Sequence, residues 1–187
     1  MTDLVLSTPP AGLILTPGAS ADRNDPTLVA LEASLPEIAV DRLTLATTSV
    51  PNALKKIAAA AAEFAERIGA DPDQIAFGGR SFGGRACSVA VAEGLPAAGL
   101  VLLSYPLHPP GKPENLRTEH LPRISIPTLF LSGDKDPFGT PIEFDEHIDA
   151  VTGPIRMEWV AGNHSPKASI PQITGVVRHF LGFSPAP

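Results

Sequence analysis

Three side chains that together can perform nucleophilic catalysis occur along the chain in the order Ser81, Asp136 and His164. A serine hydroxyl is a weak nucleophile near neutral pH and needs an imidazole to take its proton, while a carboxylate fixes the tautomer of that imidazole and stabilises its cation. Ser81 is the middle residue of the stretch 79–83, which reads Gly-Arg-Ser-Phe-Gly and matches the pattern G-x-S-x-G. In that pattern the serine sits on a strained turn between a strand and a helix. The sequence therefore predicts an acyl-transfer site with Ser81 as its nucleophile.

The residues around Ser81 predict the strand and the helix that such a turn requires. Residues 74–77 are short, apolar and compatible with a strand, which Gly78 and Gly79 are expected to end, and residues 86–92 are apolar almost all round, as in a buried helix. Gly79 and Gly83 are expected to let the strand and the helix approach closely, because a side chain at either position would collide with the neighbouring strand or helix. The alternative is a glycine-rich connection in which the serine is an ordinary N-cap.

Asp136 and His164 each follow a segment predicted to be a strand. Ligands of open parallel sheets bind at the carboxyl ends of the strands, so the loops that carry these residues are predicted to meet the loop of Ser81. Asp134 is the alternative to Asp136, which we prefer because the following proline favours an extended backbone at that residue. For His164, an ordinary turn at 162–165 is the alternative.

The transition state of acyl transfer needs hydrogen-bond donors at the developing oxyanion, each worth about 3 kcal/mol. The backbone N–H of Phe82 is the predicted first donor, and Ala19, in the loop after the first core strand, is the predicted second. Gly18 is the less favoured second donor and another candidate for the substrate site, with a tight turn as the alternative. Arg80 and Arg85 flank the serine, and each is either a contact for an anionic substrate or a member of a surface ion pair.

A long segment, residues 105–126, has neither helical nor strand periodicity and is rich in proline. Long irregular loops in compact domains are usually functional or mobile, and this one is predicted to form the wall or lid of the cleft. Tyr105 and His108 are its predicted substrate contacts. His120, together with His147 and His179, is expected to be solvated.

The remaining pattern alternates strands and helices, which predicts one domain over residues 1–187 with a three-layer α/β/α sandwich and a mainly parallel sheet of about six strands. The expected strands are 12–16, 40–45, 74–77, 99–104, 127–131 and 155–160, with at most a short edge strand at 4–6. The expected helices begin at Pro26, near Ser49 to Asn52, near Gly83 and at Thr140 (continuing to Val151), and a last one contains residues 173–180.

Composition excludes several classes of protein. The chain has 187 residues, 43% of them hydrophobic, and a formal net charge of −6 without a basic stripe, which argues against nucleic-acid binding. It has neither an 18-residue apolar run nor a signal-peptide pattern, so we expect no membrane association and a cytoplasmic location. The single cysteine, Cys87, cannot form an internal disulfide and is expected to pack in the core. No histidine cluster has metal-ligand spacing, so neither a metal nor a cofactor is expected.

Three segments, GGRSFGGR around Ser81, SYPLHPPGKPENLRTEHLP at 104–122 and LSGDKDPFGT at 131–140, resemble the α/β-hydrolase superfamily, close to dienelactone-hydrolase-like proteins. Within these, the chain resembles the branch that includes the hydrolase-like regulatory subunit of the nuclear NSL complex. The resemblance implies that Ser81, Asp136 and His164 occupy the triad positions. The chain departs from the family pattern in two ways. Pro17 stands where the family commonly has a histidine that braces the oxyanion loop, and the length leaves no room for a separate cap domain, so residues 105–126 are expected to select the substrate.

These observations predict a compact, cap-less serine hydrolase that acts on a small-molecule carboxyl ester or thioester, with the oligomeric state left open. The alternative is a catalytically weak or inactive hydrolase fold that serves as a binding or scaffolding module.

Overall fold

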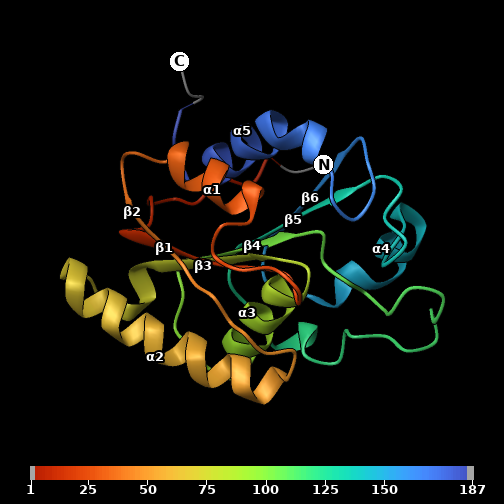
Figure 1. Ribbon diagram of the computed structural model, residues 1–187, viewed down its shortest axis with the longest axis horizontal. Coiled ribbons are helices and arrows are strands. Elements are labelled where there is room, and N and C mark those ends of the chain that lie inside the picture. The colour runs from red at the N-terminus through yellow and green to blue at the C-terminus, as the bar shows by residue number, and fades with distance from the viewer. Residues whose placement is uncertain (1–2, 185–187) are drawn as a thin grey trace.

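The fold of this chain, seen in a computed structural model that describes residues 3–184, is built on a six-stranded sheet with the order β2-β1-β3-β4-β5-β6 (Figure 1). Every neighbouring pair of strands is parallel. The strands are β1 Gly12–Thr16, β2 Ala39–Arg42, β3 Ile75–Arg80, β4 Gly99–Leu103, β5 Thr128–Gly133 and β6 Ile155–Val160. The α-helices are α1 Pro26–Ala33, α2 Val50–Ile68, α3 Phe82–Ala92, α4 Pro141–His147 and α5 Ile170–Phe180. The predicted α/β fold class is therefore confirmed.

Helices cover both faces of the sheet, which explains why its central strands are apolar throughout. In Figure 1, α1 and α5 lie above the sheet and α2 and α3 lie below it. Two separate hydrophobic clusters match these layers: one joins the sheet to α2 and α3 through residues such as Phe64 and Phe77, and the other joins it to α1 and α5 through residues such as Leu28 and Phe180. Parallel strands buried on both faces are expected to read as continuous hydrophobic runs, as β4 does.

Local signals in the sequence set the helix ends. Asp25 caps α1 by accepting a hydrogen bond from the N–H of Thr27, and Pro26 occupies the first turn. In α4, Thr140 and Glu143 form the predicted capping box. That helix ends at His147 and continues only as a short 3₁₀ turn, Ile148–Ala150, so the predicted extension of the α-helix to Val151 was wrong.

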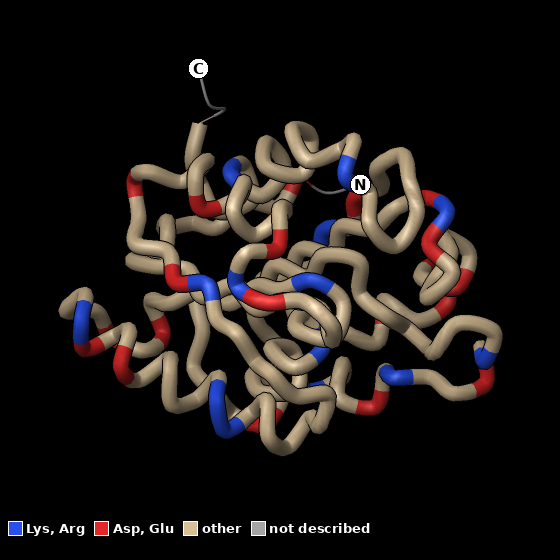
Figure 2. The backbone as a smooth tube through the Cα atoms, viewed as in Figure 1, with Lys and Arg blue, Asp and Glu red and all other residues tan. Residues whose placement is uncertain are grey.

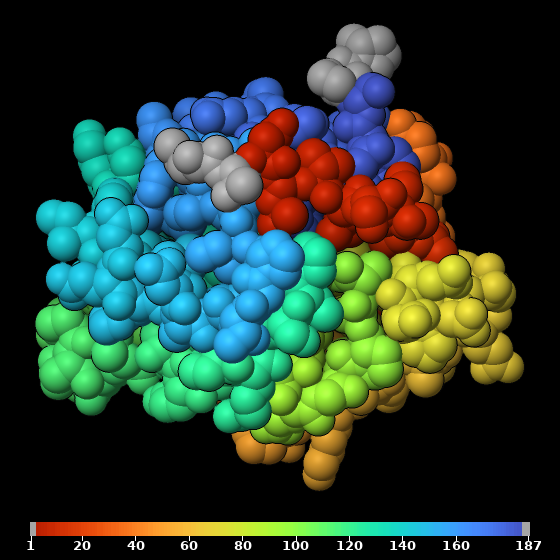
Figure 3. Space-filling view, turned by 180° about the vertical axis from the view of Figure 1, so that it is seen from behind, coloured from red at the N-terminus to blue at the C-terminus, as the bar shows by residue number. Residues whose placement is uncertain are grey.

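Two predictions about strands were also wrong. Strand β3 does not end before Gly78 but runs through both glycines to Arg80, because β1 pairs with its residues 75–79 and β4 with its residues 76–80. The second predicted strand, 40–45, was wrong at its end, since β2 stops at Arg42. Residues 4–6, for which at most a short edge strand was expected, form none. Instead, the N–H of Leu6 donates to the carbonyl of Phe180 at 2.8 Å and the Leu6 side chain is buried. Figure 3 shows the N-terminal segment packed against the C-terminal part of the chain.

Residues of both charge signs are scattered along the backbone of residues 3–184 (Figure 2). Within residues 3–184, no helix is long and apolar enough to cross a membrane, and no group of three or more His, Cys, Asp or Glu side chains is arranged to hold a metal ion.

Candidate active site

Ser81 occupies a strained turn between β3 and α3. Its backbone has φ 53° and ψ −121°, a conformation that residues with a side chain adopt rarely. A Cβ atom at Gly79 would lie 2.1 Å from Thr16 Oγ1 and 2.6 Å from the nitrogen of Gly84. The strand and the helix can therefore approach one another only because residue 79 has no side chain, as the sequence predicted.

Gly83 performs the same function toward β1. A Cβ atom at this position would lie 2.4 Å from the carbonyl oxygen of Pro17 and 2.6 Å from that of Thr16. This close approach holds the loop after β1 against the start of α3. As a result, Gly18 and Ala19 line the same pocket as Ser81 and Phe82.

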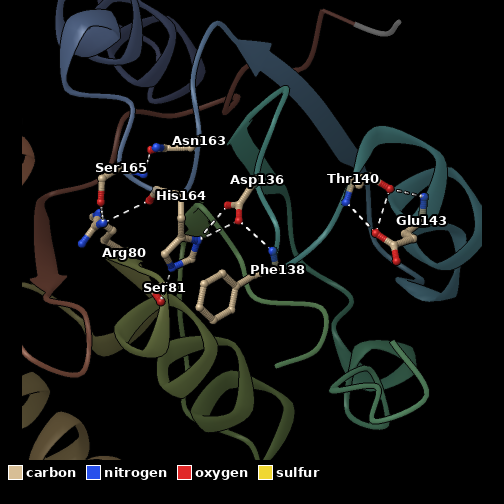
Figure 4. A network of polar contacts seen from close by, with 9 residues as sticks. All are labelled: Arg80, Ser81, Asp136, Phe138, Thr140, Glu143, Asn163, His164 and Ser165. Atoms are coloured by element: carbon tan, nitrogen blue, oxygen red, sulfur yellow. Dashed lines mark hydrogen bonds and ion pairs between the residues drawn. The ribbon is translucent and has the colours of Figure 1, made fainter. Parts of the chain in front are cut away.

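The hydroxyl of Ser81 is joined to a histidine and a carboxylate (Figure 4). Ser81 Oγ lies 2.8 Å from His164 Nε2, and His164 Nδ1 lies 2.8 Å from Asp136 Oδ2 and 3.0 Å from Asp136 Oδ1. The three residues follow β3, β5 and β6, whose carboxyl ends lie at one edge of the sheet. The loops after β5 and β6 are tied together by hydrogen bonds from the N–H of Asp134 to Val160 and from that of Lys135 to Gly162, both 2.9 Å.

Asp136 is nearly inaccessible, with 1% of its surface exposed. Besides His164, it accepts a hydrogen bond of 2.9 Å at Oδ1 from the N–H of Phe138. The ring of Phe138 stacks on the imidazole of His164, with centroids 4.0 Å apart and planes inclined by 24°. The imidazole is therefore held at both ring nitrogens and on one face.

The rival carboxylate, Asp134, does not contact His164. Its Oδ1 accepts a hydrogen bond of 2.9 Å from the N–H of Gly162, so it braces the loop that carries the histidine.

Arg80 links three loops around the serine. Its guanidinium donates to the carbonyl oxygen of His164 at 3.0 Å and to the hydroxyl of Ser165 (Figure 4). It also lies 3.5 Å from Asp25 Oδ2. Arg80 therefore forms the ion pair, with Asp25, that was one of its two predicted roles. It also lines the pocket, and its contact with an anionic substrate stays a prediction.

A pocket of about 520 Å³ opens above Ser81. It is lined by Gly18, Ala19, Ser20, Ala21, Thr48, Arg80, Ser81, Phe82, Arg85, Pro106, Arg117, Phe138, His164 and Ser165. The backbone N–H groups of Ala19 and Phe82 make no hydrogen bond with other atoms of residues 3–184. Phe82 is the first residue of α3, where N–H groups have no partner within the helix and the helix dipole favours negative charge.

Tyr105 and His108, predicted to be substrate contacts, do not line this pocket. Tyr105 is fully buried, and its hydroxyl donates to the carbonyl oxygen of Arg117 at 2.7 Å. His108 is 4% exposed, with Nδ1 2.8 Å from the carbonyl oxygen of Pro109 and Nε2 3.2 Å from Glu143 Oε1. Both predictions were wrong because the ends of the segment 105–126 are packed into the core, and only residues such as Pro106 and Arg117 face the pocket.

His120, expected to be solvated, is also buried. Its Nε2 lies 2.7 Å from Ser88 Oγ and 3.5 Å from the hydroxyl of Tyr105. Burial, with a further contribution from the charge of Arg85, lowers the pKa of His120 from 6.5 to about 4, so the ring is neutral near pH 7. Cys87 is buried as predicted and lies 3.3 Å from Thr16 Oγ1; burial raises the pKa of its thiol to about 12, which makes it unreactive.

Sequence reasoning missed two residues of the site. Phe138 could have been suspected from its position two residues after Asp136, at the same strand end. Arg117 carried no signal of this kind, since it lies within an irregular segment and reaches the pocket only because the segment folds back on the sheet.

Residues 11–172 match the model of a protein family described as an alpha/beta hydrolase domain. The chain belongs to this family. Solved structures similar to it include Est1E from Butyrivibrio proteoclasticus, with 18% sequence identity, a TM-score of 0.74 and coverage of 93% of this chain and 87% of that one.

Two further solved structures have a comparable likeness. Dienelactone hydrolase from Anabaena variabilis has 15% sequence identity, a TM-score of 0.73 and coverage of 94% of this chain and 87% of that one. A thermophilic esterase from Thermogutta terrifontis has 17% sequence identity, a TM-score of 0.70 and coverage of 93% of this chain and 90% of that one. At these identities the likeness shows the shared fold. The finer resemblance to the NSL-complex branch stays a prediction.

Proposed function

We propose that this α/β hydrolase is a serine hydrolase that cleaves a carboxyl ester or thioester through an acyl-enzyme intermediate, with Ser81 as its nucleophile. The observation that supports this proposal most strongly is the continuous hydrogen-bonded chain from Ser81 Oγ through His164 to Asp136, in which each contact is 2.8 Å. The chain starts at a serine held in a strained backbone conformation at the base of the pocket. Its order and geometry are those expected of a nucleophile, a base and an orienting carboxylate.

The first half of the reaction forms the acyl-enzyme. His164 Nε2 takes the proton of Ser81 while Oγ attacks the carbonyl carbon, and the electron pair of the carbonyl bond moves to its oxygen. The N–H groups of Phe82 and Ala19 stabilise that oxyanion, and Asp136 stabilises the imidazolium cation. The carbonyl bond then re-forms, the bond to the leaving alcohol or thiol breaks, and the leaving group takes the proton from His164.

The second half repeats these steps with water in place of serine. His164 removes a proton from a water molecule that enters from the open side of the pocket, and the hydroxide attacks the acyl carbon. Collapse of the tetrahedral intermediate releases the carboxylic acid and returns the proton to Ser81. Every step uses groups of this chain and water, so no metal or cofactor is part of the proposal.

Labelling with a fluorophosphonate tests the proposal without knowledge of the substrate, because an activated serine displaces fluoride from phosphorus. We expect the probe to modify Ser81, and we expect Ser81→Ala to abolish both labelling and hydrolysis of short acyl esters. The control Ser125→Ala removes an exposed serine outside the pocket and should leave both unchanged. Absence of labelling in the folded parent protein would favour the alternative, a hydrolase fold used for binding.

A further inference from the structure

The pocket above Ser81 is positively charged although the chain as a whole is acidic. The chain has 20 acidic and 14 basic residues, yet the residues that line the pocket include three arginines and no aspartate or glutamate. Arg80 has a partner in Asp25. Arg85 and Arg117 make no ion pair with a carboxylate among residues 3–184.

The main chain of Arg117 is fixed by two short hydrogen bonds. Its N–H donates to the carbonyl oxygen of Leu107 at 2.7 Å, and its carbonyl oxygen accepts from the Tyr105 hydroxyl at 2.7 Å. Tyr105 and Leu107 are themselves buried in the core. The irregular segment therefore presents Arg117 to the pocket from an anchored backbone, which reduces the entropy lost when a ligand is bound.

A buried network holds Arg85 in the same way. Ser88 Oγ donates to the carbonyl oxygen of Arg85 at 2.9 Å and lies 2.7 Å from His120 Nε2. Since Ser88 uses its one proton on that carbonyl, the neutral His120 ring donates from Nε2. Arg85 stands one helical turn after Ser81 on α3, so its side chain and the nucleophile lie on the same side of that helix.

The two guanidinium groups lack a counter-charge. Arg85 Nε is buried without a hydrogen-bond partner, an arrangement that is unfavourable unless something else satisfies it. Burial and the charge of Arg85 lower the pKa of Arg117 below its ordinary value. The nearby acidic residue, Glu119, is exposed and does not line the pocket. An anion between the two arginines would supply the counter-charge that both guanidinium groups lack.

We propose that this pocket selects esters that carry a free carboxylate, which Arg85 and Arg117 bind while Ser81 attacks the ester carbonyl. This inference rests on the proposed function. A guanidinium presents a planar set of donors that matches a carboxylate with two parallel hydrogen bonds, and a site built from two such groups discriminates strongly against a neutral group of the same shape.

The test compares substrates that differ in charge and little in shape. Monomethyl glutarate carries its carboxylate on the acyl side, and its primary amide, methyl glutaramate, is the neutral counterpart. Acetoxyacetate and acetoxyacetamide form the matching pair with the charge on the alcohol side. We expect kcat/KM for the carboxylate of at least one pair to exceed that of its amide by about 10- to 100-fold at low salt, the range of a charged hydrogen bond. The favoured pair identifies the side of the scissile bond that faces the arginines.

Arg85→Gln and Arg117→Gln should each reduce this preference by about tenfold or more, because each removes one charged donor. Lys112→Gln removes an exposed cation of the same segment and serves as the matched control, with the preference unchanged. Melting temperatures verify folding, and Arg117→Gln alone suffices if Arg85→Gln does not fold. Calorimetric binding of monomethyl glutarate to Ser81→Ala, and its loss when Arg117→Gln is added, gives a readout that needs no catalysis.

Equal kcat/KM within each pair, or a preference that survives in both arginine variants, would overturn the inference while leaving the serine hydrolase intact. Failure of Ser81 to react with a fluorophosphonate would instead overturn the proposed function, whatever the calorimetry shows.

Discussion

Replacing Asp136 with asparagine separates the orienting role of this residue from its packing. In the structure, Oδ1 accepts a hydrogen bond from the N–H of Phe138 and Oδ2 faces Nδ1 of His164. The amide oxygen of an asparagine must take the Oδ1 position, because its NH₂ group would otherwise oppose the N–H of Phe138. That NH₂ group then faces Nδ1, which has to be unprotonated to accept it.

The consequence is a histidine with its proton on the wrong nitrogen. A ring that accepts at Nδ1 carries its proton on Nε2, 2.8 Å from Ser81 Oγ, and cannot remove the proton of the serine. We expect kcat to fall by about 10⁴-fold, equivalent to about 5 kcal/mol, as in serine triads that lose this carboxylate. The melting temperature should change little, because the asparagine fills the same space. Hydrolysis of p-nitrophenyl acetate and the thermal unfolding curve measure the two effects.

Asp134→Asn is the matched control, since it makes the same chemical change two residues away. Its amide oxygen can still accept the hydrogen bond from Gly162, so kcat should stay within about threefold of the parent, a difference below 1 kcal/mol. If Asp136→Asn retained kcat within about tenfold of the parent, or if Asp134→Asn were the more damaging change, the reasoning about the histidine tautomer would be refuted.

Two further predictions concern stability. Gly79→Ala should lower the free energy of unfolding by about 3 kcal/mol or more, because the new Cβ would lie 2.1 Å from Thr16 Oγ1. Gly175→Ala in α5 should raise the free energy of unfolding by about 0.5 to 1 kcal/mol, because a Cβ there would have no neighbouring atom within 4 Å. Calorimetry on both variants checks this, and melting shifts of the same sign would contradict it. The pKa of His120 is lowered from 6.5 to about 4, so between these two pH values only the unfolded state binds a proton at this residue. The free energy of unfolding should therefore fall by about 3 kcal/mol as the pH decreases from above 6.5 to about 4. Urea unfolding at several pH values should show a smaller decrease for His120→Gln, and an unchanged decrease would show that the proton is bound elsewhere.

The fold could be predicted from the sequence because its local signals agree with one another. Apolar strands, a proline after the Asp25 cap and the capping box at Thr140 each specify the same alternation of strands and helices. The errors fell where tertiary contacts decide. Gly78 and Gly79 disfavour a strand locally but extend β3, since β1 and β4 supply hydrogen bonds on both sides.

The candidate site could be predicted only where its residues stand at the ends of strands. Ser81, Asp136 and His164 do so, and the parallel sheet brings such positions together. The segment 105–126 has no periodicity from which its burial could be read, so Tyr105 was expected in the cleft and Arg117 was overlooked. In the structure, the buried Tyr105 donates a hydrogen bond to the carbonyl oxygen of Arg117, and Arg117 is the residue that lines the pocket.

The position of Arg80 has a consequence for redesign of this enzyme scaffold. The guanidinium of Arg80, which precedes the turn of Ser81, contacts the cap of α1 in one loop and both His164 and Ser165 in another, so it braces that turn and two surface loops together. Grafting either loop from another hydrolase would break its contact with Arg80. The residues at 25, 80 and 165 should therefore be exchanged together, as one cassette, when this scaffold is recombined with its relatives.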